Sequence, residues 1–265
     1  LAVDLAPEDR SGEATSYVFV ALHLGSGIGA LLGEWLLREE GFDAVWLVAA
    51  GGMAAAGLVG SALRGTESTD LVAERAPAML FYPTAVLPGL ILGLGTLGFI
   101  GFNAFVPLFG DEIGVDDSAP FFFAASITIV AIRGFGARLP DKLGPVRGGT
   151  AGLCLAACGL LVIGSVRSAV GLGIGTVVLA GGTALLLPSL VTAAVRGVPI
   201  TERSRAMATY TLFLEISAAF GALMFGGIAS VSSYGTAYLV AAAITVGALA
   251  LLRATLARRV DFSPG

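Results

Sequence analysis

The sequence predicts an all-α protein, a multi-pass bundle of eight transmembrane helices. Of its 265 residues, 56% are hydrophobic and only 13% are charged, and the mean hydropathy is +0.89. A soluble domain usually holds about 25% charged residues. Lipid admits only helices and closed barrels, and the apolar runs of this chain are too long and continuous for barrel strands.

Each expected helix is an apolar run close to the 20 or so residues that a hydrocarbon core of roughly 30 Å requires. In chain order the runs span residues 15–37, 44–63, 84–109, 119–137, 149–166, 169–195, 206–231 and 234–256. Pro88 and Pro107 lie near the ends of the third run, and Pro188 interrupts the sixth.

The longest hydrophilic stretch, residues 64–77, is charged and has no apolar period, which favours a linker. The chain should therefore consist of four parts. These are two helices within residues 1–63, a linker over 64–83, a six-helix bundle over 84–259 and a tail over 260–265.

The basic residues predict the orientation. Thirteen of the fifteen Lys and Arg residues lie on one side of the expected membrane, and Arg38 and Arg167 alone lie on the other. Positive residues mark the cytoplasmic side. Both termini and the polar hinge at residues 133–147 should therefore face the cytoplasm, and the acidic loop at residues 111–118 should face out. The expected location is the inner (cell) membrane.

Composition also excludes several classes of site. The net charge of -4 is small and says nothing about nucleic acid, but the lack of a basic patch argues against such a partner. Cys154 and Cys158 lie one helical turn apart inside an apolar run, which suits neither a disulfide nor a zinc site. We expect no metal and no cofactor.

A polar hinge at residues 133–147 separates the fourth and fifth runs and holds the only lysine of the chain, Lys142. Pro140 and Gly144 favour a turn there, because glycine allows backbone conformations that other residues resist. Asp141 can accept charge-assisted hydrogen bonds from a nearby arginine or from a helix N-terminus. A solvated turn that follows the positive-inside rule is the other interpretation.

The hinge sequence RLPDKLG, residues 138–144, resembles the cytoplasmic loop motif of the major facilitator superfamily, a glycine followed by L-A-D-R-x-G and basic residues. Residues 25–34, GSGIGALLGE, resemble the antiporter motif of the fifth helix in that family, with Ala30 where the motif has proline and Glu34 where it has its last glycine. Residues 199–215 resemble the segment that opens the eleventh helix.

The resemblance implies that the eight runs correspond to helices five to twelve of a twelve-helix secondary transporter. It implies a small-molecule substrate moved by alternating access, with efflux in exchange for protons indicated by the fifth-helix motif. The first four helices of such a protein would be missing, so we expect the chain not to transport alone. The hinge would act as a cytoplasmic gate, formed by Arg138, Asp141, Lys142, Gly144 and Arg147.

Polar residues inside the apolar runs are the candidates for transport and coupling, because a charge in lipid is costly and tends to face the interior of the bundle. Glu215 lies near the middle of the seventh run and is the candidate proton or substrate site. It could instead be a structural partner for Arg133 or a backbone amide. Arg133 itself could reach the headgroups, or pair with Asp141 or Glu215.

Two further candidates lie in other runs. His23, the only histidine, could relay protons or simply hydrogen-bond a neighbouring helix. Asn103 could bind substrate or satisfy a carbonyl freed near Pro107. Gly25, Gly29 and Gly33 recur every four residues on one helix face and are expected to pack against another helix.

Two alternative functions stay open. An intramembrane enzyme acting on lipid-linked substrates would show clustered carboxylates or histidines near one membrane face, and no metalloprotease or phosphate-loop motif occurs. A membrane scaffold that transports nothing is the other alternative. The prediction is a transporter, not an enzyme, with a small-molecule substrate, protons and the lipid bilayer as its partners.

Overall fold

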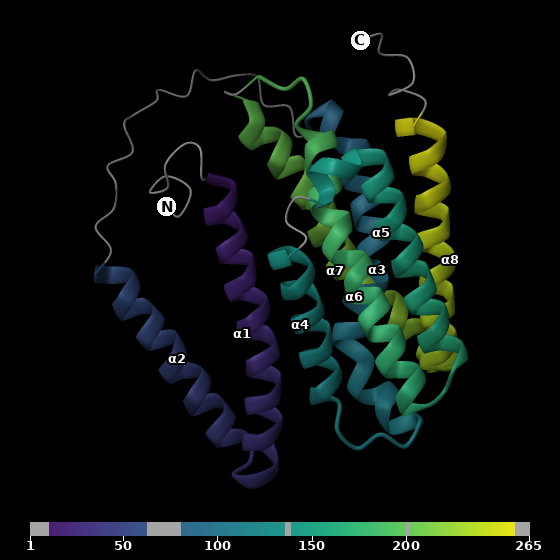
Figure 1. Cartoon of the computed structure of the whole chain (residues 1–265). Coiled ribbons are helices and arrows are strands. Elements are labelled where there is room, and N and C mark those ends of the chain that lie inside the picture. The colour runs from purple at the N-terminus through teal and green to yellow at the C-terminus, as the bar shows by residue number, and fades with distance from the viewer. Residues whose placement is uncertain (1–10, 63–80, 136–138, 200–201, 258–265) are drawn as a thin grey trace. The chain divides into compact units, whose positions relative to one another are not determined.

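The fold is that of a computed structural model, which describes residues 11–62, 81–135, 139–199 and 202–257, and leaves aside the side chains of 11–20, 22, 62, 135, 139–142 and 257 (Figure 1). The described residues form eight α-helices and a short π-helical turn. They are α1 (Ser11–Glu39), α2 (Phe42–Ala62), α3 (Pro83–Glu112), α4 (Ala119–Phe135), α5 (Leu139–Ser165), α6 (Ala169–Ala194), α7 (Arg203–Val231), α8 (Tyr234–Leu252) and η3 (Arg253–Ala257). The predicted all-α, eight-helix architecture is confirmed, and six of these helices are long and apolar enough to cross a membrane.

The chain divides into two compact units, Leu1–Ala78 and Met79–Gly265. In the first unit α1 ends where Gly41 takes a φ of 82°, and the amides of Glu40 and Gly41 donate to the carbonyl of Leu36. This is a glycine-terminated helix end, at the polar break that the sequence predicts. Large apolar side chains of α2 remain exposed, Trp46 at 71% and Met53 at 77%, as suits a surface that faces lipid or other helices.

The glycines of α1 were expected to pack against another helix. A Cβ built on Gly25, Gly29 or Gly33 would meet no atom within 4 Å, so no described neighbour makes use of their small size. Their role in packing stays a prediction.

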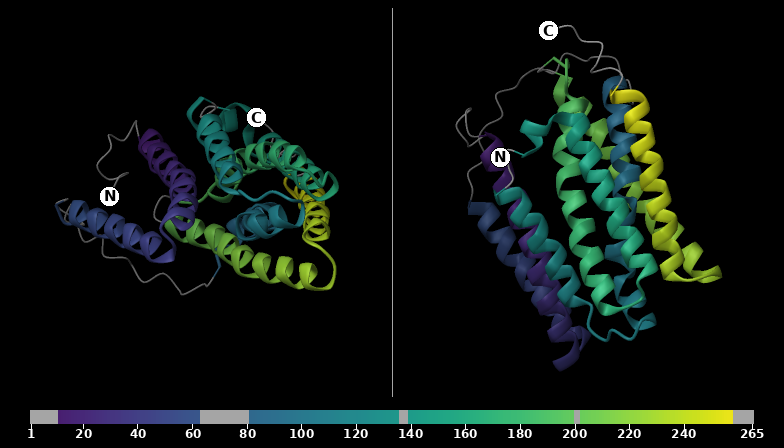
Figure 2. Two further views of the ribbon diagram at one scale, coloured as in Figure 1. Left: turned by 90° about the horizontal axis from the view of Figure 1, so that it is seen from below. Right: turned by 45° about the vertical axis from the view of Figure 1, so that its right-hand side comes forward.

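In the second unit, α3 lies at the centre, with α5, α6, α7 and α8 around it (Figure 2). Its glycines allow this. Cβ atoms on Gly95 and Gly98 would collide with Leu153 and Leu160 of α5, and one on Gly93 would lie 2.7 Å from the carbonyl oxygen of Phe213 on α7. Helices in lipid associate through close packing of this kind, since lipid tails are as apolar as the side chains.

The closest helix pair is α5 with α6, and two reciprocal glycine pairs set its spacing. A Cβ on Gly152 would lie 2.9 Å from the carbonyl oxygen of Gly182, and one on Gly182 would lie 2.6 Å from that of Gly152. Two helical turns further along, Gly159 and Gly175 form an equivalent pair. A Cβ on Gly159 would lie 2.7 Å from the carbonyl oxygen of Gly175, and one on Gly175 would lie 2.9 Å from that of Gly159. The two backbones therefore touch at both levels, with no room for a side chain between them.

Two buried clusters fill the second unit. One, near the acidic loop, is rich in aromatic rings. The ring of Tyr238 packs edge-on against those of Phe109 and Phe225, with ring centroids 5.2 and 5.1 Å apart. The other, near the hinge, joins the starts of α3 and α7 to the ends of α6 and α8 around Tyr210. Both tyrosines are almost fully buried, at 0% and 1% exposure.

The two buried tyrosines should respond differently to loss of the hydroxyl. Tyr210 donates to the carbonyl of Leu187 at 2.8 Å, whereas the hydroxyl of Tyr238 has no partner among the described groups. We expect Tyr210→Phe to cost about 1 kcal/mol, because a buried acceptor loses its donor, and Tyr238→Phe to be neutral or stabilising. Thermal unfolding midpoints of the purified variants in detergent measure both effects. An equal loss in the two variants would contradict the assignment.

The hinge departs from the predicted simple turn. α5 begins at Leu139, so the segment of Pro140, Asp141 and Lys142 is helical, and the bend is confined to Gly144, with φ 71° and ψ 171°. Proline is compatible with the first helical turn, where an N–H group has no helical acceptor, and this explains why Pro140 starts a helix. Gly144 supplies the left-handed φ, and Pro145 follows it.

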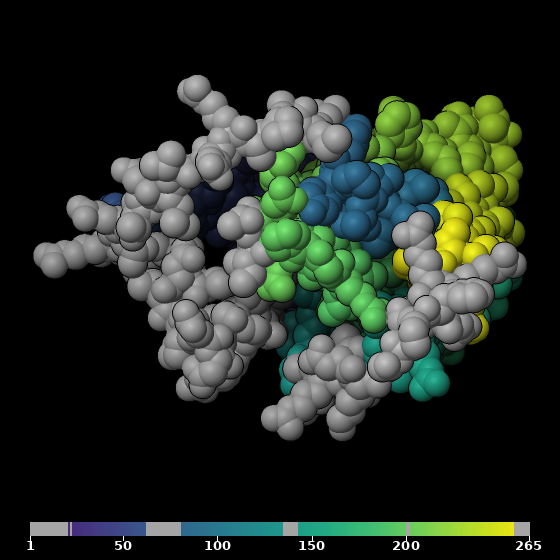
Figure 3. Space-filling model, turned by 90° about the horizontal axis from the view of Figure 1, so that it is seen from above, coloured from purple at the N-terminus to yellow at the C-terminus, as the bar shows by residue number. Residues whose placement is uncertain are grey.

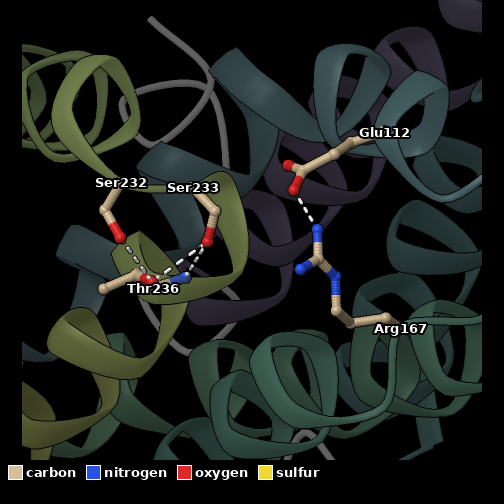
Figure 4. Close-up of polar contacts among 5 residues, drawn as sticks. All are labelled: Glu112, Arg167, Ser232, Ser233 and Thr236. Atoms are coloured by element: carbon tan, nitrogen blue, oxygen red, sulfur yellow. Dashed lines mark hydrogen bonds and ion pairs between the residues drawn. The ribbon is translucent and has the colours of Figure 1, made fainter.

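The ends of the second unit away from the hinge are fixed by polar contacts (Figure 4). Glu112, at the end of α3, forms an ion pair with Arg167, in the loop between α5 and α6. Ser233 caps α8 by accepting from the amide of Thr236 at 3.1 Å. Ser and Thr at this position satisfy amides that a helix start leaves open.

Candidate functional site

Glu215 lies on the exposed surface of α7, in the middle of a helix long and apolar enough to span a membrane. No hydrogen bond or ion pair joins its carboxylate to the described part of the chain, so neither Arg133 nor a backbone amide holds it there. An unpaired carboxylate in a membrane-spanning helix is costly unless it faces a water-filled space.

Asn103 lies on the exposed surface of α3, also inside a membrane-spanning helix. Its side-chain nitrogen donates to the carbonyl of Phe99 at 2.8 Å. The carbonyl that Pro107 leaves without a helical donor is that of Asn103 itself, four residues earlier. The Asn103 side chain therefore does not donate to the carbonyl that Pro107 leaves without a helical donor.

Glu215 and Asn103 line the same hollow, one from α7 and the other from α3. It is an open depression with a volume of about 470 Å³. The remaining lining is apolar, from Phe99, Ile100, Ala104, Leu214 and Ala218. The sequence singled out both polar residues, but their 112-residue separation hides that they share a site.

A buried hydrogen bond also joins α3 to α7. Ser217, two residues after Glu215, donates its hydroxyl to the carbonyl of Gly93 on α3 at 2.6 Å. Sequence analysis did not identify Ser217, and its only signal is a small hydroxyl residue in an apolar helix. The bond fixes the two helices that carry Glu215 and Asn103.

A second set of contacts ties α3, α6 and α7 together at the end of the second unit where α3 and α7 begin and α6 ends. The amide of Tyr82 donates to the hydroxyl of Thr209 at 2.8 Å, and the hydroxyl of Thr84 donates to the carbonyl of Ala194 at 3.4 Å. Figure 3 views this end, where the first residues of α3 (blue) lie beside the green segment that leads into α7.

Tyr82 also contacts the segment before α7 through its side chain. Glu202 accepts a hydrogen bond from the Tyr82 hydroxyl, and this bond, with the negative charge beside it, raises the pKa of Tyr82 above its ordinary value. The hydroxyl therefore stays protonated and keeps donating throughout the physiological pH range. Sequence analysis did not single out either residue.

The other two transport candidates lie elsewhere. Arg133 is half-buried in the last turn of α4, and His23 is half-buried in α1. Each interacts with another group of the protein. Arg133 does not line the hollow, and His23 belongs to the first unit. The structure thus brings together two of the four predicted residues.

The structure describes only some of the five predicted gate residues in full. Arg138 lies outside the described residues, and Asp141 and Lys142 are described in their backbone alone, as part of the first turns of α5. Gly144 forms the kink, and Arg147 is exposed beyond it. A gating role for this set stays a prediction.

Among the described residues, no group of three or more His, Cys, Asp and Glu side chains lies close enough to hold a metal ion. The polar chemistry of the candidate site is therefore that of one carboxylate and one amide in an apolar hollow.

Comparison with known proteins gives one family. The family profile described as Major Facilitator Superfamily matches residues 1–181. The uncharacterized MFS-type transporter STM4428 of Salmonella typhimurium is 28% identical over 240 residues, which cover 90% of this chain and 61% of that protein. The uncharacterized MFS-type transporter YhhS of Escherichia coli is 30% identical over 168 residues, which cover 62% of this chain and 41% of that protein. The chain thus spans about three fifths or less of the length of these relatives.

Proposed function

The chain belongs to the major facilitator superfamily, and on that premise we propose that it is part of a secondary transporter that exports a small molecule by alternating access in exchange for protons. It is a multi-pass membrane protein, of a family of transporters and not of enzymes. The substrate and the coupling ion are part of the proposal.

The observation that supports the proposal best is the position of Glu215. It is the one ionisable side chain among the residues that line the hollow, and it makes no bond within the described chain. A carboxylate kept unpaired in a membrane-spanning helix can exchange a proton or hold a ligand, and such residues mark proton and substrate paths.

The proposed direction rests on the sequence of α1. The residues around Gly25, Gly29 and Gly33 resemble the antiporter motif of the fifth helix, which favours efflux. The location in the inner (cell) membrane, with both termini in the cytoplasm, rests on the basic loops.

The proposed domain arrangement assigns α1 and α2 to the first half of the transporter and α3 to α8 to the second. Transporters of this type bind substrate between two such halves. The α5 kink at Gly144 would then lie at the cytoplasmic gate. In the complete transporter, Asp141→Asn should shift the balance between inward-open and outward-open states, and an unchanged balance with full transport would remove the gate.

Proton exchange can be tested in inverted membrane vesicles that contain the complete transporter. Respiration acidifies the vesicles, acridine-orange fluorescence reports the pH gradient, and a transported compound releases protons. Compounds of three classes serve as probes: tetraphenylphosphonium, the neutral sugar maltose, and benzoate.

We expect at least one class to dissipate the gradient in these vesicles and not in vesicles that lack the protein. Silence for all three classes, with the protein present and folded, would contradict proton-coupled export.

A further inference from the structure

We propose that Cys154 and Cys158, on an exposed face of α5, bind one soft divalent metal ion of the Hg²⁺ type between their two sulfur atoms. They are the only cysteines of the chain, and both are free and exposed. Neither lines the hollow between α3 and α7, and their site does not depend on the proposed transport function. Three features carry the inference: the spacing of the thiols, the open face that presents them, and the surroundings.

The two thiols are neighbours on one face of the helix. Residues four apart in an α-helix place their Cβ atoms about 5–6 Å from each other. A disulfide needs Cβ atoms about 3.5–4.5 Å apart, so the helix holds the two sulfurs too far apart to be joined directly. Two metal–sulfur bonds of about 2.3 Å each, on opposite sides of one ion, span about 4.6 Å between the sulfurs. The spacing therefore suits a bridging ion where it does not suit a disulfide.

The face of α5 that carries the cysteines is open within the second unit. α5 packs against α6 through Gly152 and Gly159, whereas Leu155 and Leu161, beside the cysteines, are 39% and 45% exposed. The segment Leu143–Ser165 is long and apolar enough to span a membrane, and both cysteines lie near its middle. A ligand can therefore reach both sulfurs from the lipid without disturbing the side of the helix that packs against α6.

The surroundings select the kind of ion. Thiolates are soft ligands, which soft metal ions prefer. Zn²⁺ takes four ligands, and among the described residues no third His, Cys, Asp or Glu side chain joins the pair in a metal-binding group. A charge in lipid is costly, so the complex should be neutral. Two thiolates with one divalent ion are neutral, whereas two thiolates with Cu⁺ carry a net negative charge. An ion such as Hg²⁺, which accepts two thiolates in line, meets all these conditions.

Binding releases protons and chloride and moves no electrons between oxidation states. The thiolate is the ligand, so each S–H bond breaks with its electron pair left on sulfur, and each sulfur forms one bond to mercury. One HgCl2 and two thiols thus give one bis-thiolate complex, two protons and two chloride ions. Mercuric chloride is itself neutral and can reach the site through an apolar phase.

The test counts mercury atoms in the purified 265-residue chain in detergent, by mass spectrometry after excess HgCl2 is removed. We expect one mercury per chain and no thiol left for a maleimide, because both sulfurs hold the same ion. Methylmercury can bond to only one thiol, so two methylmercury groups should bind to each chain.

The matched control is the double variant Cys158→Ala, Leu161→Cys. It keeps two thiols at exposed positions of α5 but places them seven residues apart. The rise between them is about 10.5 Å, which one ion with two sulfur ligands cannot span. The folded double variant, with the unfolding midpoint of the wild type, should take up two mercury atoms per chain, each with one chloride retained.

Competition with glutathione measures the strength of the bridge. The glutathione concentration that removes half of the mercury should be at least about tenfold higher for the wild type than for the double variant, because the second bond of the pair forms within one molecule. Two mercury atoms per wild-type chain, or pairs of chains joined by one mercury, would overturn the inference. Equal resistance to glutathione in the two proteins would do so as well, since the spacing of the thiols would then have no effect.

Discussion

Replacing Gly182 by valine is expected to prevent the second unit from folding. A Cβ at this position would lie 2.6 Å from the carbonyl oxygen of Gly152 and even closer to the amide nitrogen of Ala156. Both are backbone atoms, so no side chain can rotate away to make room. Overpacking a well-packed interior costs about 1–3 kcal/mol, and more where a backbone must move.

The loss should extend beyond the point of contact. Without a hydrophobic driving force between helices in lipid, α5 and α6 are held by close packing, and separating the backbones weakens both glycine pairs together. The expected result is a large fall in the yield of monodisperse protein and in its unfolding midpoint in detergent.

The control is Gly173→Ala on the same helix. A Cβ there would lie 3.7 Å from the ring of Phe121, an ordinary contact, and alanine favours a helix over glycine by about 0.8–1.0 kcal/mol. Gly173→Ala should therefore be neutral or stabilising. Wild-type yield and midpoint for Gly182→Val would show that α5 and α6 do not approach as closely as described.

This comparison also shows what sequence can reveal about helix packing. The eight apolar runs predicted the eight helices to within a few residues at most ends, because length and hydropathy are local properties. The packing glycines were not predicted. A repeat such as Gly25, Gly29 and Gly33 defines a face but does not say whether a partner covers it.

The glycines that do pack, Gly152, Gly159, Gly175 and Gly182, are unremarkable within either helix. Their seven-residue spacing becomes meaningful only when α5 and α6 lie antiparallel and each glycine meets its counterpart. The pairing is a property of two helices together, and no single apolar run contains it.

The candidate site divides in the same way. Glu215 and Asn103 could be selected from the sequence, because polar residues in membrane-spanning helices are rare and costly. Their common hollow, which Arg133 does not line, depends on how the helices of the second unit pack. The sequence also could not show which carbonyl the Asn103 amide nitrogen contacts. The structure shows that it donates to the carbonyl of Phe99 and not to the carbonyl that Pro107 leaves without a helical donor.

Glu215→Gln in the complete transporter should abolish proton exchange, the largest functional effect that a single side chain is expected to produce. The glutamine keeps the size of the side chain and one accepting oxygen but can neither release nor bind a proton at neutral pH. Among the residues that line the hollow, no other ionisable group can replace it.

In the vesicle assay the rate of substrate-induced proton release should fall at least about tenfold, the equivalent of losing roughly 1.4 kcal/mol of interaction. Glu215→Asp should retain part of the rate, and Asp111→Asn should retain nearly all of it. The latter changes net charge by the same amount on an exposed surface.

A coupling role is separated from a structural one by measuring exchange without a gradient. If Glu215 only carries the proton, the Gln variant should still exchange labelled substrate across the membrane at equilibrium while failing to release protons. Loss of both activities in a folded variant would place Glu215 in substrate binding as well. Unchanged proton release would remove Glu215 from the coupling mechanism, and another ionisable group of the complete transporter would then have to carry the proton.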